Sequence, residues 1–238
     1  MNASTEKTPP GPGRAARTQD GPRGAGRGGG LRHLAMMALL LIGPPGPEVL
    51  GGRSPRPNRV PAAVDEEGEG IVVGAGPLTV DVYLDFLCPF CRLFEQTTGP
   101  VLERLVAQDL IEVVYHPMGF LDELSTTRYS SRASAASGCA SDAGGFVEYA
   151  HALFAAQPPE GGPGLSDDEL IALGEQVGLR EPGFAECVRN ATYLDWATYV
   201  TERALKRGVA ATPTVLVQGL PVPANPRPIL NAVAALTA

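Results

Sequence analysis

The motif Cys88-Pro89-Phe90-Cys91 stands where the sequence changes its period, and this junction constrains the fold most. Apolar and polar residues alternate over 78–87 (LTVDVYLDFL), which is typical of a strand. From residue 89 to 106 apolar residues recur every three or four positions, which predicts an amphipathic helix. Residues 110–116 (LIEVVYH) return to a strand pattern. The order strand, helix, strand predicts a βαβ unit with both cysteines at the start of its helix.

The rest of the body separates into a helical block and a closing hairpin. Residues 126–208 are rich in Ala and show helical patterns without a strand pattern. The helices expected in this block span about 126–142, 144–156, 166–178, 182–190 and 191–208. A short strand is expected at 71–73, a hairpin at 214–222 and a last helix at 227–237. The fold class is therefore α/β, a βαβ unit and a ββα unit separated by an all-helical insertion at about 126–208.

The two cysteines of the motif are suited to disulfide exchange. Pro favours the first position of a helix, so Pro89 makes Cys88 the N-cap. The Cys88 sulfur then faces free N–H groups and the positive end of the helix dipole, and both favour the thiolate. A thiolate near neutral pH is the species that exchanges disulfides. Cys91 lies one turn further on the same side, within reach of Cys88.

Half of a zinc site is the alternative interpretation of a Cys-x-x-Cys pair, and an inert pair is a second one. A closed zinc site needs two more ligands, usually another tight pair. Cys139 and Cys187 are 48 positions apart, and His33, His116 and His151 form no pair at ligand spacing. The sequence therefore favours redox chemistry, with no metal and no other cofactor expected.

The first 70 residues differ from the body in composition. Residues 1–59 hold nine Lys or Arg and three Asp or Glu, whereas residues 60–238 hold ten basic and 23 acidic residues. An acidic body argues against nucleic-acid binding. We expect a disordered basic head over 1–33 and a linker over 46–70. The apolar run within 34–45 has nine residues, about 14 Å as a helix, too short for a bilayer core of about 30 Å. It fits a secretory signal or a short anchor, the alternative being an accidental apolar run in a disordered tail.

Together these features resemble the thioredoxin fold, and more narrowly the DsbA-like thiol-disulfide oxidoreductases of the exported actinobacterial type. The resemblance runs from about residue 71 to 238. The residues that carry it are Asp85 to Cys91 (DFLCPFC), Cys139-Ala140, Leu153-Phe154, Cys187-Val188, Trp196, Gly208-Val209 and Thr212-Pro213-Thr214.

The resemblance implies roles for particular residues. Cys88 and Cys91 would form the redox disulfide, with Cys91 as the resolving cysteine. The sequence alone leaves both isomers of the Thr212–Pro213 bond open, whereas the resemblance implies a cis bond packed against the active-site sulfurs and a Thr212 backbone that pairs with substrate. Cys139 and Cys187, which the sequence alone also allows as two buried free thiols, would form a structural disulfide.

The resemblance also implies a setting. The chain would be a monomeric enzyme of the cell envelope, secreted or held at the membrane by its N-terminal segment. It would oxidise unfolded or reduced exported proteins and be reoxidised by a quinone-linked membrane thiol oxidase. A disulfide reductase or isomerase is one alternative, and a non-catalytic thioredoxin-fold binding or chaperone module is another.

Three departures from the family pattern bear on these expectations. Many thioredoxin-fold enzymes carry a buried carboxylate where this chain has Val82. Asp85 is the nearest acid and is a candidate proton relay to Cys91, the alternative being a carboxylate that only caps the strand end. Strongly oxidising relatives often have His at the position of Phe90, and the group often has a long membrane helix that the head lacks.

Overall fold

The structure, a computed structural model, describes residues 56–237. The expected basic head, the apolar segment 34–45 and the first part of the expected linker lie outside the described residues. No helix within 56–237 is both long and apolar enough to cross a bilayer.

A five-stranded sheet forms the centre of the body. Its strands are β1 (Ile71–Gly74), β2 (Leu78–Leu84), β3 (Ile111–Pro117), β4 (Thr214–Val217) and β5 (Leu220–Val222), in the order β1-β3-β2-β4-β5. β2 and β3 run parallel, and every other neighbouring pair is antiparallel. The expected βαβ unit and the closing hairpin are therefore both present, and the α/β thioredoxin-like fold class is confirmed.

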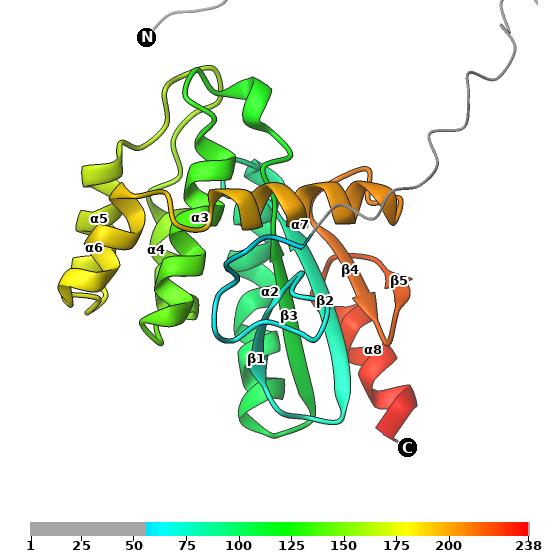
Figure 1. Ribbon diagram of the computed structural model, residues 1–238. Helices are drawn as coiled ribbons and strands as arrows, with labels where there is room; N and C mark the ends of the chain where they lie inside the picture. Colours follow the sequence, from blue (N-terminus) through cyan, green and yellow to red (C-terminus); the bar gives the residue numbers. More distant parts are fainter. Residues whose placement is uncertain (1–55, 238) are drawn as a thin grey trace, which may run out of the picture. The chain divides into compact units, whose positions relative to one another are not determined.

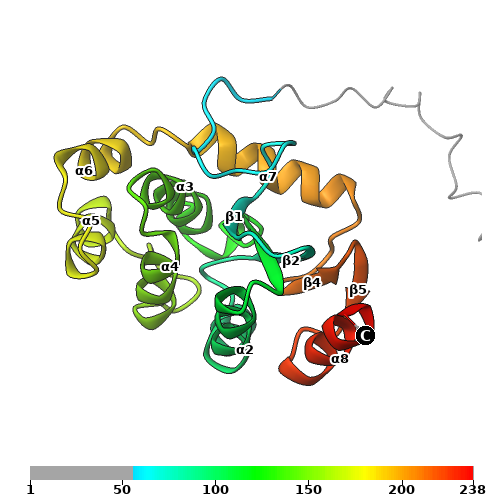
Figure 2. The same cartoon turned by 90° about the horizontal axis from the view of Figure 1, so that it is seen from below.

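Helices cover both faces of this sheet. α2 (Pro89–Ala107) and α8 (Pro226–Thr237) lie side by side on one face, and α7 (Leu194–Lys206) crosses the other, as Figure 2 shows. β2 is consequently buried on both sides: Val82 faces one layer and the neighbouring Tyr83 the other, each at most 2% exposed. The face of β2 that carries the polar residues of the alternating pattern is therefore not exposed to solvent, because α7 covers it.

The helical insertion packs against one end of the sheet layer. It consists of a 3₁₀ turn (Asp122–Leu124), α3 (Tyr129–Asp142), α4 (Phe146–Ala155), α5 (Asp167–Gln176) and α6 (Pro182–Arg189). Figure 1 shows α3 to α6 grouped together beside the sheet. The expected helices exist with ends within a few residues of the expected ones. The last of them, α7, lies on the sheet as well as on α3, so it joins the insertion to the thioredoxin-like core.

The segment before β1 differs from the expected linker. Glu69 is 2% exposed and forms ion pairs with Arg203 (2.5 Å) and Arg207 (2.8 Å) of the α7 region. Val64 forms a bridge to Ile71 at the start of β1. A charged side chain is buried only when it is paired, and this pairing fixes the end of the segment on the body. The folded part therefore begins before residue 70.

Candidate active site

The redox motif lies between the end of β2 and the start of α2. A turn closes this junction, in which the Cys88 N–H donates to the Asp85 carbonyl at 3.0 Å. Cys88 is the N-cap of α2 with extended backbone angles, and Pro89 occupies the first helical turn. The motif therefore has the local geometry that the sequence predicts. The Cys88 sulfur lies at the helix end, where the free N–H groups of the first turn point.

The pKa values of the two thiols are shifted in opposite directions. The pKa of Cys88 is lowered to about 6, chiefly by a hydrogen bond from the Cys91 thiol, with the N–H groups of Cys91 and Phe90 adding to it against the effect of burial. The pKa of Cys91 is raised well above its ordinary value, first by burial and then by the neighbouring Cys88. Cys91 accepts a further contact from the Asp85 N–H, at 3.5 Å. Near neutral pH the reduced pair is therefore a Cys88 thiolate beside a Cys91 thiol.

The Asp85 carboxylate lies fully buried behind the motif. One oxygen accepts hydrogen bonds from the Leu87 N–H (2.8 Å) and the Ser130 hydroxyl (2.7 Å), and the other accepts from the Leu121 N–H (2.8 Å). Burial raises the pKa of Asp85 to about 7, although these hydrogen bonds act in the opposite direction. A carboxyl group that titrates near neutrality can take or give a proton at physiological pH.

The Thr212–Pro213 loop lies against the redox motif. The peptide bond is cis, as the resemblance implies. When it is protonated, the Cys88 thiol donates to the Thr212 carbonyl oxygen, with 3.3 Å between sulfur and oxygen. Pro213 directly precedes β4, which pairs with β2. The sheet therefore brings together two segments 124 residues apart.

Gln157, which sequence reasoning missed, ties the helical insertion to this junction. Its side-chain amide donates to the carbonyl oxygens of Phe86 (2.9 Å) and Cys88 (3.0 Å). Nearby, the Phe154 ring packs on the Phe86 ring with 5.0 Å between centroids. Gln157 stands in a loop after α4 without any recognisable motif, so no sequence pattern could have singled it out.

Two apolar side chains are exposed on the motif's helix. Phe90, between the cysteines, is 71% exposed, and Leu93 is 55% exposed. Both lie within the first two turns of α2. The two side chains therefore form an exposed apolar pair close to the Cys88 sulfur.

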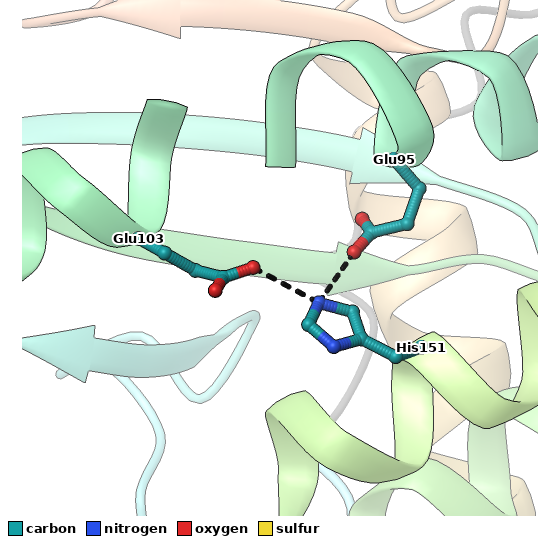
Figure 3. A group of neighbouring side chains, drawn as sticks. All are labelled: Glu95, Glu103 and His151. Carbon is teal, nitrogen blue, oxygen red and sulfur yellow. Dashed lines mark ion pairs between the residues drawn. The ribbon is translucent and has the colours of Figure 1, made fainter. Parts of the chain in front are cut away.

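The two histidines within residues 56–237 have other contacts. His116 is buried and bonds the Glu69 carbonyl oxygen (2.8 Å) and Asp81 (3.0 Å). His151 instead lies between Glu95 and Glu103, as Figure 3 shows. Within residues 56–237 this is the one group of three side chains placed to share a metal ion. The sequence did not reveal it, because its members come from two helices.

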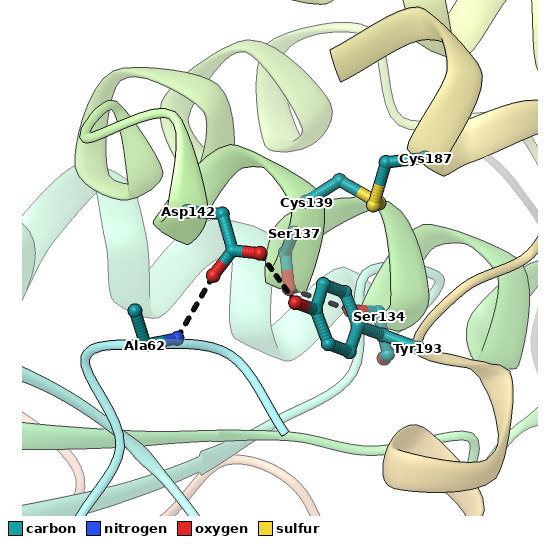
Figure 4. The surroundings of a disulfide bond; sticks show 7 residues. All are labelled: Ala62, Ser134, Ser137, Cys139, Asp142, Cys187 and Tyr193. Carbon is teal, nitrogen blue, oxygen red and sulfur yellow. Dashed lines mark hydrogen bonds between the residues drawn. A yellow bond between two sulfur atoms is a disulfide. The ribbon is translucent and has the colours of Figure 1, made fainter. Parts of the chain in front are cut away.

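Cys139 and Cys187 form a disulfide, the pairing that the resemblance implies. It links α3 to α6 across a separation of 48 residues, with 5.8 Å between the two Cα atoms. Figure 4 shows the bond beside a second link, in which Asp142 accepts hydrogen bonds from the Tyr193 hydroxyl and the Ala62 N–H. Because these two sulfurs are bonded to each other, they are not available to Cys88 and Cys91 as fellow zinc ligands.

The comparisons with known proteins agree with this geometry. The model of a protein family described as thioredoxin matches residues 66–228. The chain belongs to this family. Within it, the chain is similar to the reduced disulfide oxidoreductase DsbG of Mycobacterium tuberculosis, with 30% identity, a TM-score of 0.58, and coverage of 72% of this chain and 95% of that one.

Two further solved structures are similar to this thioredoxin-family chain. Reduced DsbA of Mycobacterium tuberculosis is 28% identical, with a TM-score of 0.58 over 70% of this chain and 98% of that one. The thiol-disulfide oxidoreductase MdbA of Actinomyces oris shares the fold, with 19% identity and a TM-score of 0.61 over 75% and 93% of the two chains. The DsbA-like resemblance is therefore confirmed, and so is the enzyme class that it implies, a thiol-disulfide oxidoreductase.

One further relative is a much longer protein, of which only a part matches this chain. The serine/threonine-protein kinase PknE of Mycobacterium tuberculosis is 33% identical over 138 residues, which is 54% of this chain and 24% of the kinase. The match therefore spans about a quarter of that relative.

Proposed function

We propose that this thioredoxin-family enzyme oxidises dithiols in exported proteins through the Cys88–Cys91 disulfide. The observation that carries the proposal is the opposite acidity of the two thiols, with the Cys88 pKa near 6 and the Cys91 pKa raised. A stabilised Cys88 thiolate stabilises the reduced enzyme, which makes the disulfide form a better oxidant. A thiol of low pKa is also the better leaving group in exchange.

The reaction proceeds by two exchanges. A substrate thiolate attacks the Cys88 sulfur, the Cys88–Cys91 bond breaks, and the electron pair and a proton go to Cys91. A second substrate thiolate then attacks the substrate sulfur of the mixed disulfide, and Cys88 leaves as a thiolate. The substrate loses two electrons and gains a disulfide, while the enzyme ends as a reduced pair and needs no metal or nucleotide.

Asp85 is the proposed proton relay for Cys91. Its backbone N–H contacts the Cys91 sulfur, and its carboxyl group titrates near pH 7. A buried acid of that pKa takes up the Cys91 proton when the thiol must react and returns it when the sulfur leaves.

Substrate docking is assigned to Thr212 and Pro213. The Thr212 carbonyl lies 3.3 Å from the Cys88 sulfur, so a peptide paired with this backbone would place its own cysteine at Cys88. The exposed side chains of Phe90 and Leu93 supply apolar contact to an unfolded segment.

The proposed setting is the cell envelope. By its resemblance to the exported DsbA-like enzymes, the chain acts outside the cytoplasm as a monomer, with residues 34–45 as signal or anchor. A quinone-linked membrane thiol oxidase then returns the Cys88–Cys91 pair to the disulfide.

The reduction potential of the Cys88/Cys91 couple against glutathione tests the direction of the reaction. An oxidase should have a potential above about −200 mV, whereas about −270 mV would indicate a reductase of the thioredoxin type. Oxidation of a reduced two-cysteine peptide is the second measurement. The Cys88→Ala, Cys91→Ala double variant should be inactive, and full biological activity of that variant would instead support a binding or chaperone module.

A further inference from the structure

Three side chains with metal-binding atoms converge between two helices away from the cysteines. Glu95 and Glu103 project from α2 and His151 projects from α4 toward them (Figure 3). The His151 Nε2 atom lies 2.7 Å from Glu95 Oε1 and 3.1 Å from Glu103 Oε1. One atom from each of the three residues lies within 4.8 Å of the others.

The group opens onto a pocket of about 330 Å³. The remaining lining residues are Gln96, Pro100, Phe154 and Ala155. Glu95 is the more enclosed acid, with 13% of its side chain exposed, while the Glu103 and His151 side chains are 45% and 43% exposed. One side of the group is therefore held by the protein, and the other leaves room for water or a small ligand.

The charge of the pocket is unbalanced. Two carboxylates face a single imidazole, and no Lys or Arg lines the pocket within the described residues. A divalent cation would neutralise both carboxylates and bind Nε2 in place of the proton that Nε2 shares with them, which would pass to solvent. The surplus of negative charge therefore favours a cation at the point where the three ligand atoms meet.

The donor types restrict the ion. Imidazole nitrogen suits zinc and its transition-metal neighbours, whereas calcium and magnesium prefer oxygen alone. Metal–ligand distances of about 2.0–2.2 Å separate neighbouring ligand atoms by about 3–3.5 Å. The observed separations of 2.7 and 3.1 Å need only a small widening to reach that range.

We propose that Glu95, Glu103 and His151 form a binding site for a divalent transition-metal ion of the zinc class. Three protein ligands bind the ion, and the pocket leaves its remaining position to water. The ion would link α2, which carries the redox cysteines, to α4, and the site does not depend on the direction of the redox reaction.

Zinc titration of the oxidised full-length protein, followed by calorimetry, tests the site. The oxidised form is needed because a reduced Cys88/Cys91 pair would itself bind zinc; the Cys88→Ala, Cys91→Ala variant serves the same purpose. We expect one zinc ion per chain, and at least tenfold weaker binding in Glu103→Gln and in His151→Ala. Glu148→Gln is the matched control, because it removes one carboxylate from the exposed side of the same helix α4 and should leave binding unchanged.

A second measurement protects the test against variants that fold poorly. Zinc should raise the unfolding temperature of the Cys88→Ala, Cys91→Ala protein and should fail to do so after the further change Glu103→Gln, which alters a half-exposed side chain. Calcium at the same concentration should have no effect. No zinc binding at about 100 µM, or zinc binding that Glu103→Gln and His151→Ala leave unchanged, would overturn the proposal.

Discussion

Two cysteines one helical turn apart differ in acidity because their surroundings differ. Cys88 caps the helix, where the Cys91 thiol and the backbone N–H groups of the first turn lower its pKa. Cys91 is 1% exposed, and this burial raises its pKa because a thiolate there is poorly solvated. The division of roles between the two sulfurs therefore follows from position, since the residue type is the same.

Titration of the reduced protein should show this difference. We expect thiolate absorbance at 240 nm to appear with a midpoint near pH 6 and to belong to Cys88. Because this pKa lies below that of an unfolded thiol, the thiolate stabilises the reduced fold at pH values above the unfolded pKa, and that stabilisation is lost as pH falls through about 6.

Cys91→Ala is the informative variant for this measurement. It removes the largest contribution to the lowered pKa, so the Cys88 midpoint should move upward. Alkylation of the reduced protein should modify Cys88 first. In the unchanged protein, a Cys88 midpoint at the ordinary thiol value of about 8.5 would contradict the assignment. Faster labelling of Cys91 than of Cys88 would contradict it as well.

Asp85 should control the pH dependence of the resolving step. In a mixed disulfide of Cys88 with a small thiol, Cys88 no longer titrates, and release requires Cys91 to lose its proton. The release rate should rise as pH passes through the Asp85 pKa, because the carboxylate is ionised above it; that pKa is about 7 beside the Cys88 thiolate and lower once Cys88 carries no charge. Asp85→Asn should remove this inflection in single-turnover measurements.

Ser130→Ala gives a graded control for the same step. The Ser130 hydroxyl donates to the carboxylate and holds its pKa down, so its loss should move the inflection to higher pH. If Asp85→Asn keeps an inflection near pH 7, the proton must pass through another group.

At the scale of elements, the Cys139–Cys187 disulfide stabilises the helical insertion without entering the redox site. The bond joins α3 to α6 near the end of α3, whereas the insertion reaches the redox junction through Ser130 at the start of α3 and through the loop that carries Gln157. The Cys139→Ala, Cys187→Ala double variant should lose about 2–4 kcal/mol in urea unfolding, because the bond restricts the unfolded chain. Its Cys88 pKa should stay near that of the unchanged protein. Unaltered stability would show that the disulfide does not stabilise the insertion. A displaced Cys88 pKa would show that it influences the redox site.

At the scale of the whole molecule, the segment before β1 belongs to the folded body. The Trp196 side chain is fully buried, and its indole N–H donates to the Gly68 carbonyl at 2.9 Å. A chain that starts at residue 71 would leave this N–H without a partner and would remove Glu69 from between Arg203 and Arg207. A buried donor without a partner costs about 1–3 kcal/mol by itself.

Thermal unfolding should therefore separate two shortened chains. The chain that starts at residue 71 should unfold at a lower temperature than the chain that starts at residue 56. Glu69→Gln in the full chain isolates the ionic part of the difference. Equal unfolding temperatures for the two shortened chains would show that residues 56–70 are a linker that adds nothing to the stability of the fold.

The sequence by itself determined the order of the elements and the kind of chemistry. Strand and helix periods are local, so β2, α2 and β3 could be predicted from residues that are neighbours in the chain. The N-cap position of Cys88 follows from Pro89 for the same reason. The family resemblance added the Cys139–Cys187 pairing and the cis Thr212–Pro213 bond, neither of which periodicity contains.

Only the tertiary structure decided which distant groups meet. The Thr212 carbonyl at Cys88, the Ser130 hydroxyl at Asp85 and the Gln157 amide at the redox turn each join segments at least 45 residues apart. The meeting of His151 with two acids on another helix is of the same kind. Such contacts depend on how elements pack, and a polar residue in a loop looks the same in the sequence whether it faces water or a buried carboxylate. For the same reason the sequence did not predict that the folded body begins before residue 70. In the sequence Glu69 looks like a solvent-exposed acid, and only the fold places Arg203 and Arg207 beside it.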